Sequence, residues 1–190
     1  MIILASKSPR RSKLLSQIGL SFKVVESNIN ENDICTDSIS QEEFCKFAAI
    51  AKSQSVAKLF PKSIVIGADT VVINNDRVYG KPKSIDESKV MLESLSDGFH
   101  KVYTGVSINN FSKDLSSDFI EETTVLFRKI DNDEIDFYVN NYDVLDKAGG
   151  YGIQCYASKF VKGIEGCFYN VMGLPLSRLS VELNKLKAID

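Results

Sequence analysis

The stretch LASKSPRR, residues 4–11, marks the point where a buried strand gives way to a helix. An apolar run precedes it, and apolar residues at helical spacing follow it. Ser8 is typical of an N-cap residue and Pro9 of the first helical position, where the missing N–H of proline costs nothing. Backbone N–H groups, hydroxyls and the guanidinium groups of Arg10 and Arg11 would then converge at a helix N-terminus, which suits a phosphate chain. A solvated arginine pair on an ordinary helix is the alternative.

The rest of the chain predicts an α/β fold with a mixed sheet, because strands and helices alternate early while paired strands dominate the middle. Strands are predicted at 2–5, 22–26, 64–69 with a continuation at 71–73, 77–79, about 101–109 and about 118–130. Helices are predicted at 9–18, from 40 to about 60, from 84 to about 98, from 131 to about 141, and from 175 onwards. Three of them begin with capping signals, namely Ser40 with Glu43, Ser84 with Glu87, and Asp131 with Glu134.

Composition narrows the classes of function. With 190 residues, 44% of them hydrophobic, the chain can bury a substantial core as one domain or as a two-lobed domain. A formal net charge of −2 argues against general binding of nucleic acid, although a local basic pocket would still suit a small polyphosphate. No apolar run approaches the length of a transmembrane helix, and the N-terminus lacks the pattern of a signal peptide. We therefore expect no membrane association and a cytoplasmic location.

Carboxylates are the expected agents of any acid–base chemistry. The four cysteines form no Cys-x-x-Cys pair, which argues against a zinc site or a redox pair. His100 is the only histidine and is interpreted as an incidental strand residue. Asp69 follows an apolar run and is placed at the C-terminal end of a strand, where open α/β sheets locate their sites. With the hydroxyl of Thr70 beside it, Asp69 could hold a divalent cation or activate water, or it could simply be a turn aspartate.

Two lysines and one loop complete the candidates. Lys52 lies at the edge of the apolar stripe of its helix, where a snorkelling surface lysine is the alternative. Lys81 lies on a rigid Gly-Lys-Pro turn and could equally be a solvated side chain. The loop DKAGGYGIQ, residues 146–154, can bring backbone close to a ligand, and Gln154 offers a donor and an acceptor to a base edge. A plain glycine-rich turn is the alternative, and no P-loop or dinucleotide-binding fingerprint is present.

Taken in order, these segments resemble the Maf family of nucleotide pyrophosphatases. The segments that carry the resemblance are LASKSPRR (4–11), Lys52, GADTVV (67–72), GKP (80–82), YTGV (103–106), DKAGGYGIQ (146–154) and NVMGLP (170–175). The resemblance implies a single domain over residues 1–190: an elongated mixed sheet with flanking helices, in two lobes around a deep cleft, as in inosine triphosphate pyrophosphatases.

The implied activity is cleavage of a nucleoside triphosphate between its α- and β-phosphates, giving the monophosphate and pyrophosphate with a divalent cation, Mg²⁺ or Mn²⁺. The loop at 146–154 is similar to that of the branch acting on dTTP and UTP rather than the 7-methyl-GTP branch. Asp69 is implied as the proton acceptor, with Glu31 and Asp69 as metal ligands. Arg10, Thr70 and Gln154 are implied in substrate choice, and Ser8, Arg11, Lys52 and Lys81 in lining the triphosphate site.

The sequence departs from the family pattern at a few positions. Asn30 precedes Glu31 where relatives commonly have aspartate, which removes one possible metal ligand. Gly150 and Cys155 replace the usual alanine and glycine of the loop. Two other functions stay open: a broader house-cleaning pyrophosphatase for modified nucleotides, and a non-catalytic nucleotide-binding regulator of cell division. The four basic residues with Asp69 favour an enzyme whose partner is a nucleoside triphosphate; the oligomeric state is open, with a homodimer as one candidate.

Overall fold

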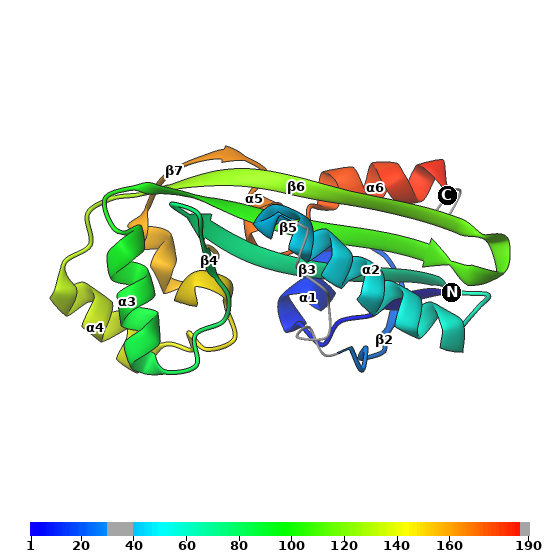
Figure 1. Ribbon diagram of the computed structural model, residues 1–190, viewed down its shortest axis with the longest axis horizontal. Coiled ribbons are helices and arrows are strands. Elements are labelled where there is room, and N and C mark those ends of the chain that lie inside the picture. The colour runs from blue at the N-terminus through cyan, green and yellow to red at the C-terminus, as the bar shows by residue number, and fades with distance from the viewer. Residues whose placement is uncertain (30–39, 187–190) are drawn as a thin grey trace. The chain divides into compact units, whose positions relative to one another are not determined.

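The computed structural model describes residues 1–29 and 40–186, and the chain divides into two compact units (Figure 1). Unit 1 comprises Met1–Asp69, Thr104–Glu121 and Gly173–Asp190, and unit 2 comprises Thr70–Tyr103 and Glu122–Met172. Across the described residues, every helix is too short or too polar to span a lipid bilayer.

The described elements follow one another along the chain in a mixed α/β order. They are β1 (Ile2–Leu4), α1 (Pro9–Gln17), β2 (Phe22–Val24), α2 (Gln41–Leu59), β3 (Ile64–Asn74), β4 (Arg77–Tyr79), α3 (Ile85–Leu95), β5 (Phe99–Asn110), η2 (Phe111–Lys113), β6 (Leu115–Phe127), α4 (Asn132–Asn141), η3 (Ala148–Gly150), η4 (Tyr156–Phe160), β7 (Val161–Gly166), α5 (Phe168–Val171) and α6 (Leu176–Lys185). Within the described residues the strands form one sheet in the order β2-β1-β3-β5-β6-β7, with β4 added to β3. The predicted mixed α/β sheet with flanking helices is confirmed.

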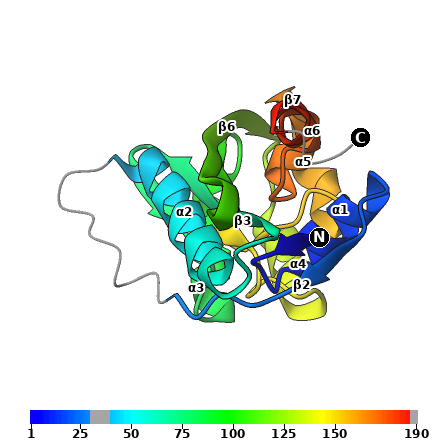
Figure 2. The ribbon, with the colours of Figure 1, turned by 90° about the vertical axis from the view of Figure 1, so that its right-hand side faces the viewer.

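Unit 1 is built on a parallel ladder. β1 pairs in parallel with both β2 and β3, and Leu4 lies opposite Val24 on one side and Ile66 on the other. Because β1 lies between the strands that precede and follow α2, right-handed crossovers place α1 and α2 on opposite faces of the sheet. Figure 2 shows the two helices on either side of the strands.

Helix α2 begins and ends as the sequence predicts. The Ser40 hydroxyl accepts from the N–H of Glu43, and the Glu43 carboxylate accepts from the N–H of Ser40, each at 3.3 Å, so the capping box is formed. The buried side of the helix carries mainly small residues, among them Ala48, Ala49 and Ser53. Small side chains allow the helix backbone to approach the sheet closely.

Two glycines on the sheet complete this close approach. A Cβ at Gly67 would overlap the carbonyl oxygen of Ala49 and lie 2.8 Å from the amide nitrogen of Ser53. A Cβ at Gly105 would overlap the backbone of Cys45. Helix α2 therefore lies directly on the backbone of β3 and β5, and its seating depends on both glycines.

Unit 2 encloses its own hydrophobic core beneath α3 and α4. The fully buried side chains of Leu92, Phe127, Tyr138 and Phe160 belong to this core. The predicted turn after β3 is also present: Asn75 and Asp76 adopt left-handed conformations, with φ of 48° and 59°, which suits a two-residue hairpin.

The capping predictions in unit 2 are confirmed only in part. Ser84 accepts from the N–H of Glu87 at 3.1 Å, but the Glu87 carboxylate accepts from the N–H of Lys83 instead of closing a reciprocal box. Asp131 occupies the N-cap position of α4 and its side chain makes no cap hydrogen bond.

The reason at α4 is a competing partner. The Glu134 carboxylate, which would complete the box, accepts two hydrogen bonds from Arg128 at 2.8 and 2.7 Å. A bidentate guanidinium–carboxylate pair is stronger than a single hydrogen bond from a backbone N–H, so the Glu134 carboxylate binds Arg128 instead of the N-cap backbone.

Candidate functional site

A buried ion pair joins helix α2 to strand β3 in unit 1. The Lys52 ammonium lies 2.7 Å from Oδ1 of Asp69, and each residue is only 9% exposed. The snorkelling alternative for Lys52 is therefore wrong, since its charge lies inside the protein. A charge is buried at this level only with a counter-charge or strong hydrogen bonds, and the two residues supply these to each other.

The position of Asp69 corrects one prediction. Asp69 does not end a strand, because β3 continues through Asn74 and its far half pairs with β4, Val72 opposite Tyr79. The β-branched residues that follow Asp69 favour extended backbone and keep the strand going. The parallel neighbour β1 ends earlier, at Leu4 opposite Ile66, so Asp69 lies just beyond the carboxyl edge of the parallel ladder. The rule for open sheets holds for that ladder rather than for β3 itself.

The buried thiol of Cys45 lies close enough to Asp69 for the charge of the carboxylate to act on it. Burial, and after it the charge of Asp69, raises the pKa of the Cys45 thiol to about 12. Cys45 lies on α2 and its Sγ–H donates to the carbonyl of Glu42 at 3.0 Å. A thiol with this pKa stays protonated at neutral pH, so it is a packing residue and not a nucleophile.

The turn after β1 is held together by Ser6. Its hydroxyl accepts from the N–H of Ser8 at 3.3 Å and from Nη1 of Arg11 at 3.1 Å. Nε of Arg11 also donates to the carbonyl of Gly173 at 2.8 Å. Ser8 takes the predicted N-cap position with Pro9 at the start of α1, but its side chain makes no cap hydrogen bond.

These contacts change the interpretation of the arginine pair. Arg11 fixes the turn to the chain segment before α6, so it has a structural role that the sequence pattern did not indicate. The turn also begins beside the strand that carries Asp69, because the N–H of Ala5 donates to the carbonyl of Ile66 at 2.8 Å. Ser8, Arg10 and Arg11 thus lie on the same unit as the Lys52–Asp69 pair.

In unit 2 the glycine-rich loop is joined to the turn that carries Lys81. The N–H of Gly149 donates to the carbonyl of Gly80 at 3.0 Å. Gly149 and Gly150 have φ of 70° and 73°, which other residues rarely adopt, and Gly149 packs on the side chain of Val72. Lys81 and Gln154 are both exposed at the two ends of this arrangement, where a ligand can reach them.

Lys147 is a residue of this loop whose role the sequence did not reveal. It is 8% exposed, and its ammonium donates to the carbonyl of Asp143 and to the carboxylate of Asp146. Gly152 packs against its methylenes, 3.1 Å from Cδ and Cε for a Cβ placed there. The available signal in the sequence was a lysine within a short segment of glycine and apolar residues. If such a segment is buried, the lysine charge needs oxygen acceptors close by.

The predicted site residues therefore fall into two described groups. Unit 1 holds Ser8, Arg10, Arg11, Lys52 and Asp69, while unit 2 holds Thr70, Lys81 and Gln154. Glu31, the second predicted metal ligand, lies outside the described residues.

The described residues contain no group of three or more histidine, cysteine, aspartate or glutamate side chains that could hold a metal ion.

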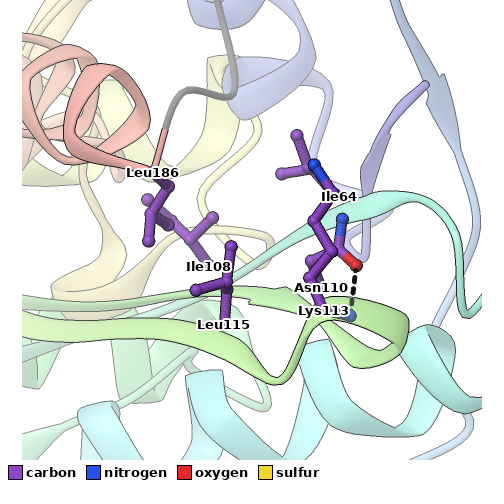
Figure 3. Close-up of a pocket in the computed structure, with 6 residues that line it drawn as sticks. All are labelled: Ile64, Ile108, Asn110, Lys113, Leu115 and Leu186. Atoms are coloured by element: carbon purple, nitrogen blue, oxygen red, sulfur yellow. Dashed lines mark hydrogen bonds between the residues drawn. The ribbon is translucent and has the colours of Figure 1, made fainter.

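Unit 1 also contains a small cavity that is unrelated to the predicted site residues. Its volume is about 20 Å³, far too small for a nucleotide, and it is lined by Ile64, Ile108, Asn110, Lys113, Leu115 and Leu186 (Figure 3). Its one dashed contact is the bond from the N–H of Lys113 to Asn110 at 3.2 Å.

Comparison with known proteins establishes the family. The sequence profile of the family described as "Maf-like protein" matches residues 1–186. The chain belongs to the Maf-like family. A protein of Geobacillus sp. (strain WCH70) named dTTP/UTP pyrophosphatase is 44% identical over 185 residues, covering 97% of each chain. A protein of the same name from Clostridium perfringens (strain SM101 / Type A) is 45% identical over 179 residues, covering 94% of this chain and 93% of the relative.

The Maf-like fold also has a distant structural relative. A HAM1 protein from Coxiella burnetii superimposes with a TM-score of 0.51 over 97% of this chain and 98% of that chain, at 16% sequence identity. At that identity the likeness shows the fold alone, and it agrees with the predicted mixed α/β sheet with flanking helices.

Proposed function

We propose that this Maf-like protein hydrolyses UTP and dTTP to the nucleoside monophosphate and pyrophosphate. The observation that carries the proposal is the match, over nearly the full length of both chains, to relatives named dTTP/UTP pyrophosphatase. The geometry supports it, because the described residues include a buried carboxylate paired with a lysine, two arginines in the same unit and a loop with an exposed amide.

Asp69 is the proposed proton acceptor. The described part of the chain contains one histidine, His100, and it is buried in the core of unit 2 with its pKa lowered to about 4 by burial. The Lys52 ammonium holds Oδ1 of Asp69 in a fixed place, so the carboxylate is oriented before substrate arrives. A positioned carboxylate can take a proton from the attacking water, which raises the rate of hydrolysis.

The basic residues supply the charge that a triphosphate needs. Arg10 and Arg11 lie at the N-terminus of α1, where backbone N–H groups and the helix dipole also favour an anion. Lys52 and Lys81 would add two ammonium groups along the phosphate chain. Fixed positive charge of this kind stabilises the negative charge that develops on the leaving pyrophosphate.

Asp69 is a suitable ligand for a hard divalent cation such as Mg²⁺. This ion usually keeps several waters and binds through one or two carboxylates together with the phosphates of its substrate. Asp69 fits that donor set, with Glu31 as the proposed second ligand. When bound, the cation would neutralise phosphate charge and polarise the scissile bond.

Base selection is assigned to Gln154 with Arg10 and Thr70. The amide of Gln154 carries both a donor and an acceptor, which match neighbouring groups on the edge of uracil and thymine. Cytosine reverses part of that pattern, so CTP would leave polar groups unpaired at a cost of about 1–3 kcal/mol each.

The decisive experiment is a substrate panel with the purified chain. Pyrophosphate release is measured with UTP, dTTP, CTP, GTP, ITP and 7-methyl-GTP, with Mg²⁺ or Mn²⁺ and with chelator. The proposal expects UTP and dTTP to have the highest kcat/KM and pyrophosphate, not phosphate, to be the product. Preference for 7-methyl-GTP, or equal turnover of CTP and UTP, would remove the base assignment; binding without turnover would indicate a nucleotide sensor.

A further inference from the structure

His100 lies in the interior of unit 2 and contacts the loop that carries Gln154. The residue is 1% exposed, and its Nε2 lies 2.7 Å from the hydroxyl of Tyr151. The imidazole meets the rings of Phe127 and Tyr151 edge-on, at centroid distances of 4.8 and 5.4 Å. His100 lies in a strand, β5, as expected, but the interpretation of it as incidental is wrong. Its side chain faces the core and contacts a residue 51 positions along the chain.

The hydrogen bond joins two uncharged groups at neutral pH. Burial lowers the pKa of His100 to about 4, and burial also raises the pKa of Tyr151 above its ordinary value. Neither group therefore carries charge at neutral pH. A neutral, short hydrogen bond between two buried groups is directional, and losing it leaves a buried polar group without its partner.

Stability alone does not account for an imidazole at this position. Nδ1 of His100 is buried and has no hydrogen-bond partner among the described residues. A buried polar atom without a partner costs free energy, and an aliphatic side chain of similar volume would avoid that cost. What the imidazole supplies, and an aliphatic group cannot, is the bond to the Tyr151 hydroxyl.

That bond holds the middle of the loop. Lys147 fixes the start of the loop through the oxygens of Asp143 and Asp146, and Gly149 is bonded to Gly80. Tyr151 comes next, and Gln154 follows three residues later. His100 thus holds Tyr151 three residues before the amide that would meet the base, and among the described side-chain hydrogen bonds of the loop this one lies nearest to Gln154 along the chain. Between them Ile153 is buried in the same core, so it continues the anchoring that Tyr151 begins.

We infer that His100 is a positioning residue for base selection: through the Tyr151 hydroxyl it fixes the conformation in which the loop presents Gln154 to the substrate. The inference rests on the proposed function and deepens it, since it adds a residue that never touches the nucleotide. Loss of the bond is expected to lower the preference for UTP over CTP by about three- to tenfold, the worth of one typical buried hydrogen bond.

The test compares kcat/KM for UTP and CTP in four variants. His100→Leu and Tyr151→Phe each remove the bond and should lower the UTP/CTP ratio. His100→Gln can still place a donor near the Tyr151 hydroxyl and should retain most of the ratio. The matched control is Tyr79→Phe, which removes another tyrosine hydroxyl from the same core, the acceptor of a bond from the Ser94 hydroxyl at 3.0 Å. This change leaves the His100–Tyr151 bond and the backbone bond between Gly149 and Gly80 in place.

A second readout, amide hydrogen exchange over residues 147–154, reports the loop directly. Faster exchange in His100→Leu and Tyr151→Phe, but not in Tyr79→Phe, is expected. An unchanged UTP/CTP ratio in both His100→Leu and Tyr151→Phe overturns the inference while leaving the pyrophosphatase intact. An equal fall in Tyr79→Phe also overturns it, because general loosening of the core would then be the cause. If His100→Leu does not fold, Tyr151→Phe decides alone, and a wild-type chain that releases no pyrophosphate from UTP or dTTP refutes both proposals.

Discussion

Replacing Asp69 by asparagine perturbs stability and catalysis together, and the structure allows the two effects to be separated. The side chains of Lys52 and Asp69 are only 11% and 12% exposed. Asparagine keeps the shape of the carboxylate but leaves the Lys52 ammonium without its buried counter-charge. Breaking a buried pair in this way costs roughly 3–5 kcal/mol, which is a large share of the roughly 5–15 kcal/mol that stabilises a typical domain.

The double variant Lys52→Met/Asp69→Asn resolves the two roles. Methionine fills the volume of the lysine stem without a charge, so the double variant should be more stable than Asp69→Asn alone. Its turnover should stay at least ~100-fold below wild type, because the proton acceptor is still missing. Urea unfolding followed by circular dichroism measures the first effect, and pyrophosphate release from UTP measures the second.

A control and two outcomes complete the design. Glu122→Gln removes an exposed pair, Lys101–Glu122 at 2.8 Å, and should leave the unfolding midpoint unchanged. Wild-type turnover in Asp69→Asn would show that Asp69 is not the proton acceptor. Equal unfolding midpoints for wild type and Asp69→Asn would show that the pair is not desolvated in solution, and the argument from burial would fail.

Three further predictions follow from the same contacts. Arg11→Lys should lower the unfolding free energy by about 1–3 kcal/mol as well as slow turnover, because lysine cannot keep both the Gly173 and the Ser6 bonds; a calorimetric melt with unchanged Tm would contradict this. Gly67→Ala should lower the unfolding free energy in urea by at least about 1–3 kcal/mol and abolish most activity, because α2 must move away from the added methyl group. Gly163→Ala, which has open space around it, should change neither the unfolding free energy nor the activity. Folding lowers the pKa of His100 from 6.5 to about 4, so between these pH values the unfolded chain binds one proton more than the folded chain. The unfolding free energy should therefore fall by about 3 kcal/mol as the pH falls from 6.5 to 4. Urea unfolding of His100→Leu over the same pH range should lack this component.

Local signals in the sequence predicted the elements well because their causes are local. The capping box at Ser40, the proline at the start of α1 and the turn at Asn75 and Asp76 each depend on groups within four residues of one another. The box at Asp131 failed for a non-local reason, since Arg128 takes the Glu134 carboxylate. Strand β7 was not predicted because its mostly exposed, glycine-containing sequence has no buried face to generate alternation.

The candidate site was predicted as a set of residues but not as a set of contacts. Asp69 and Lys52 were named separately, and nothing in their spacing indicates that they meet, because their meeting depends on how α2 is seated on Gly67 and Gly105. The structural role of Arg11 depends on Gly173, 162 residues away. Contacts of this kind arise from the topology, which residue patterns constrain only in outline.

A polar residue at a position that the surrounding pattern makes apolar is an informative signal in this sequence. Lys52 follows Ala48 and Ala49 on the buried side of α2, and Asp69 interrupts a run of buried β3 residues. His100 and Lys147 are likewise buried. Periodicity predicts burial, and burial of a charged or hydrogen-bonding group requires a partner, so each such residue predicts a contact without naming the other side. In this chain the partners are a carboxylate, a lysine, a tyrosine hydroxyl and the oxygens of Asp143 and Asp146. All of them except Asp143, which lies just before the loop, belong to the Lys52–Asp69 pair or to the loop at residues 146–154.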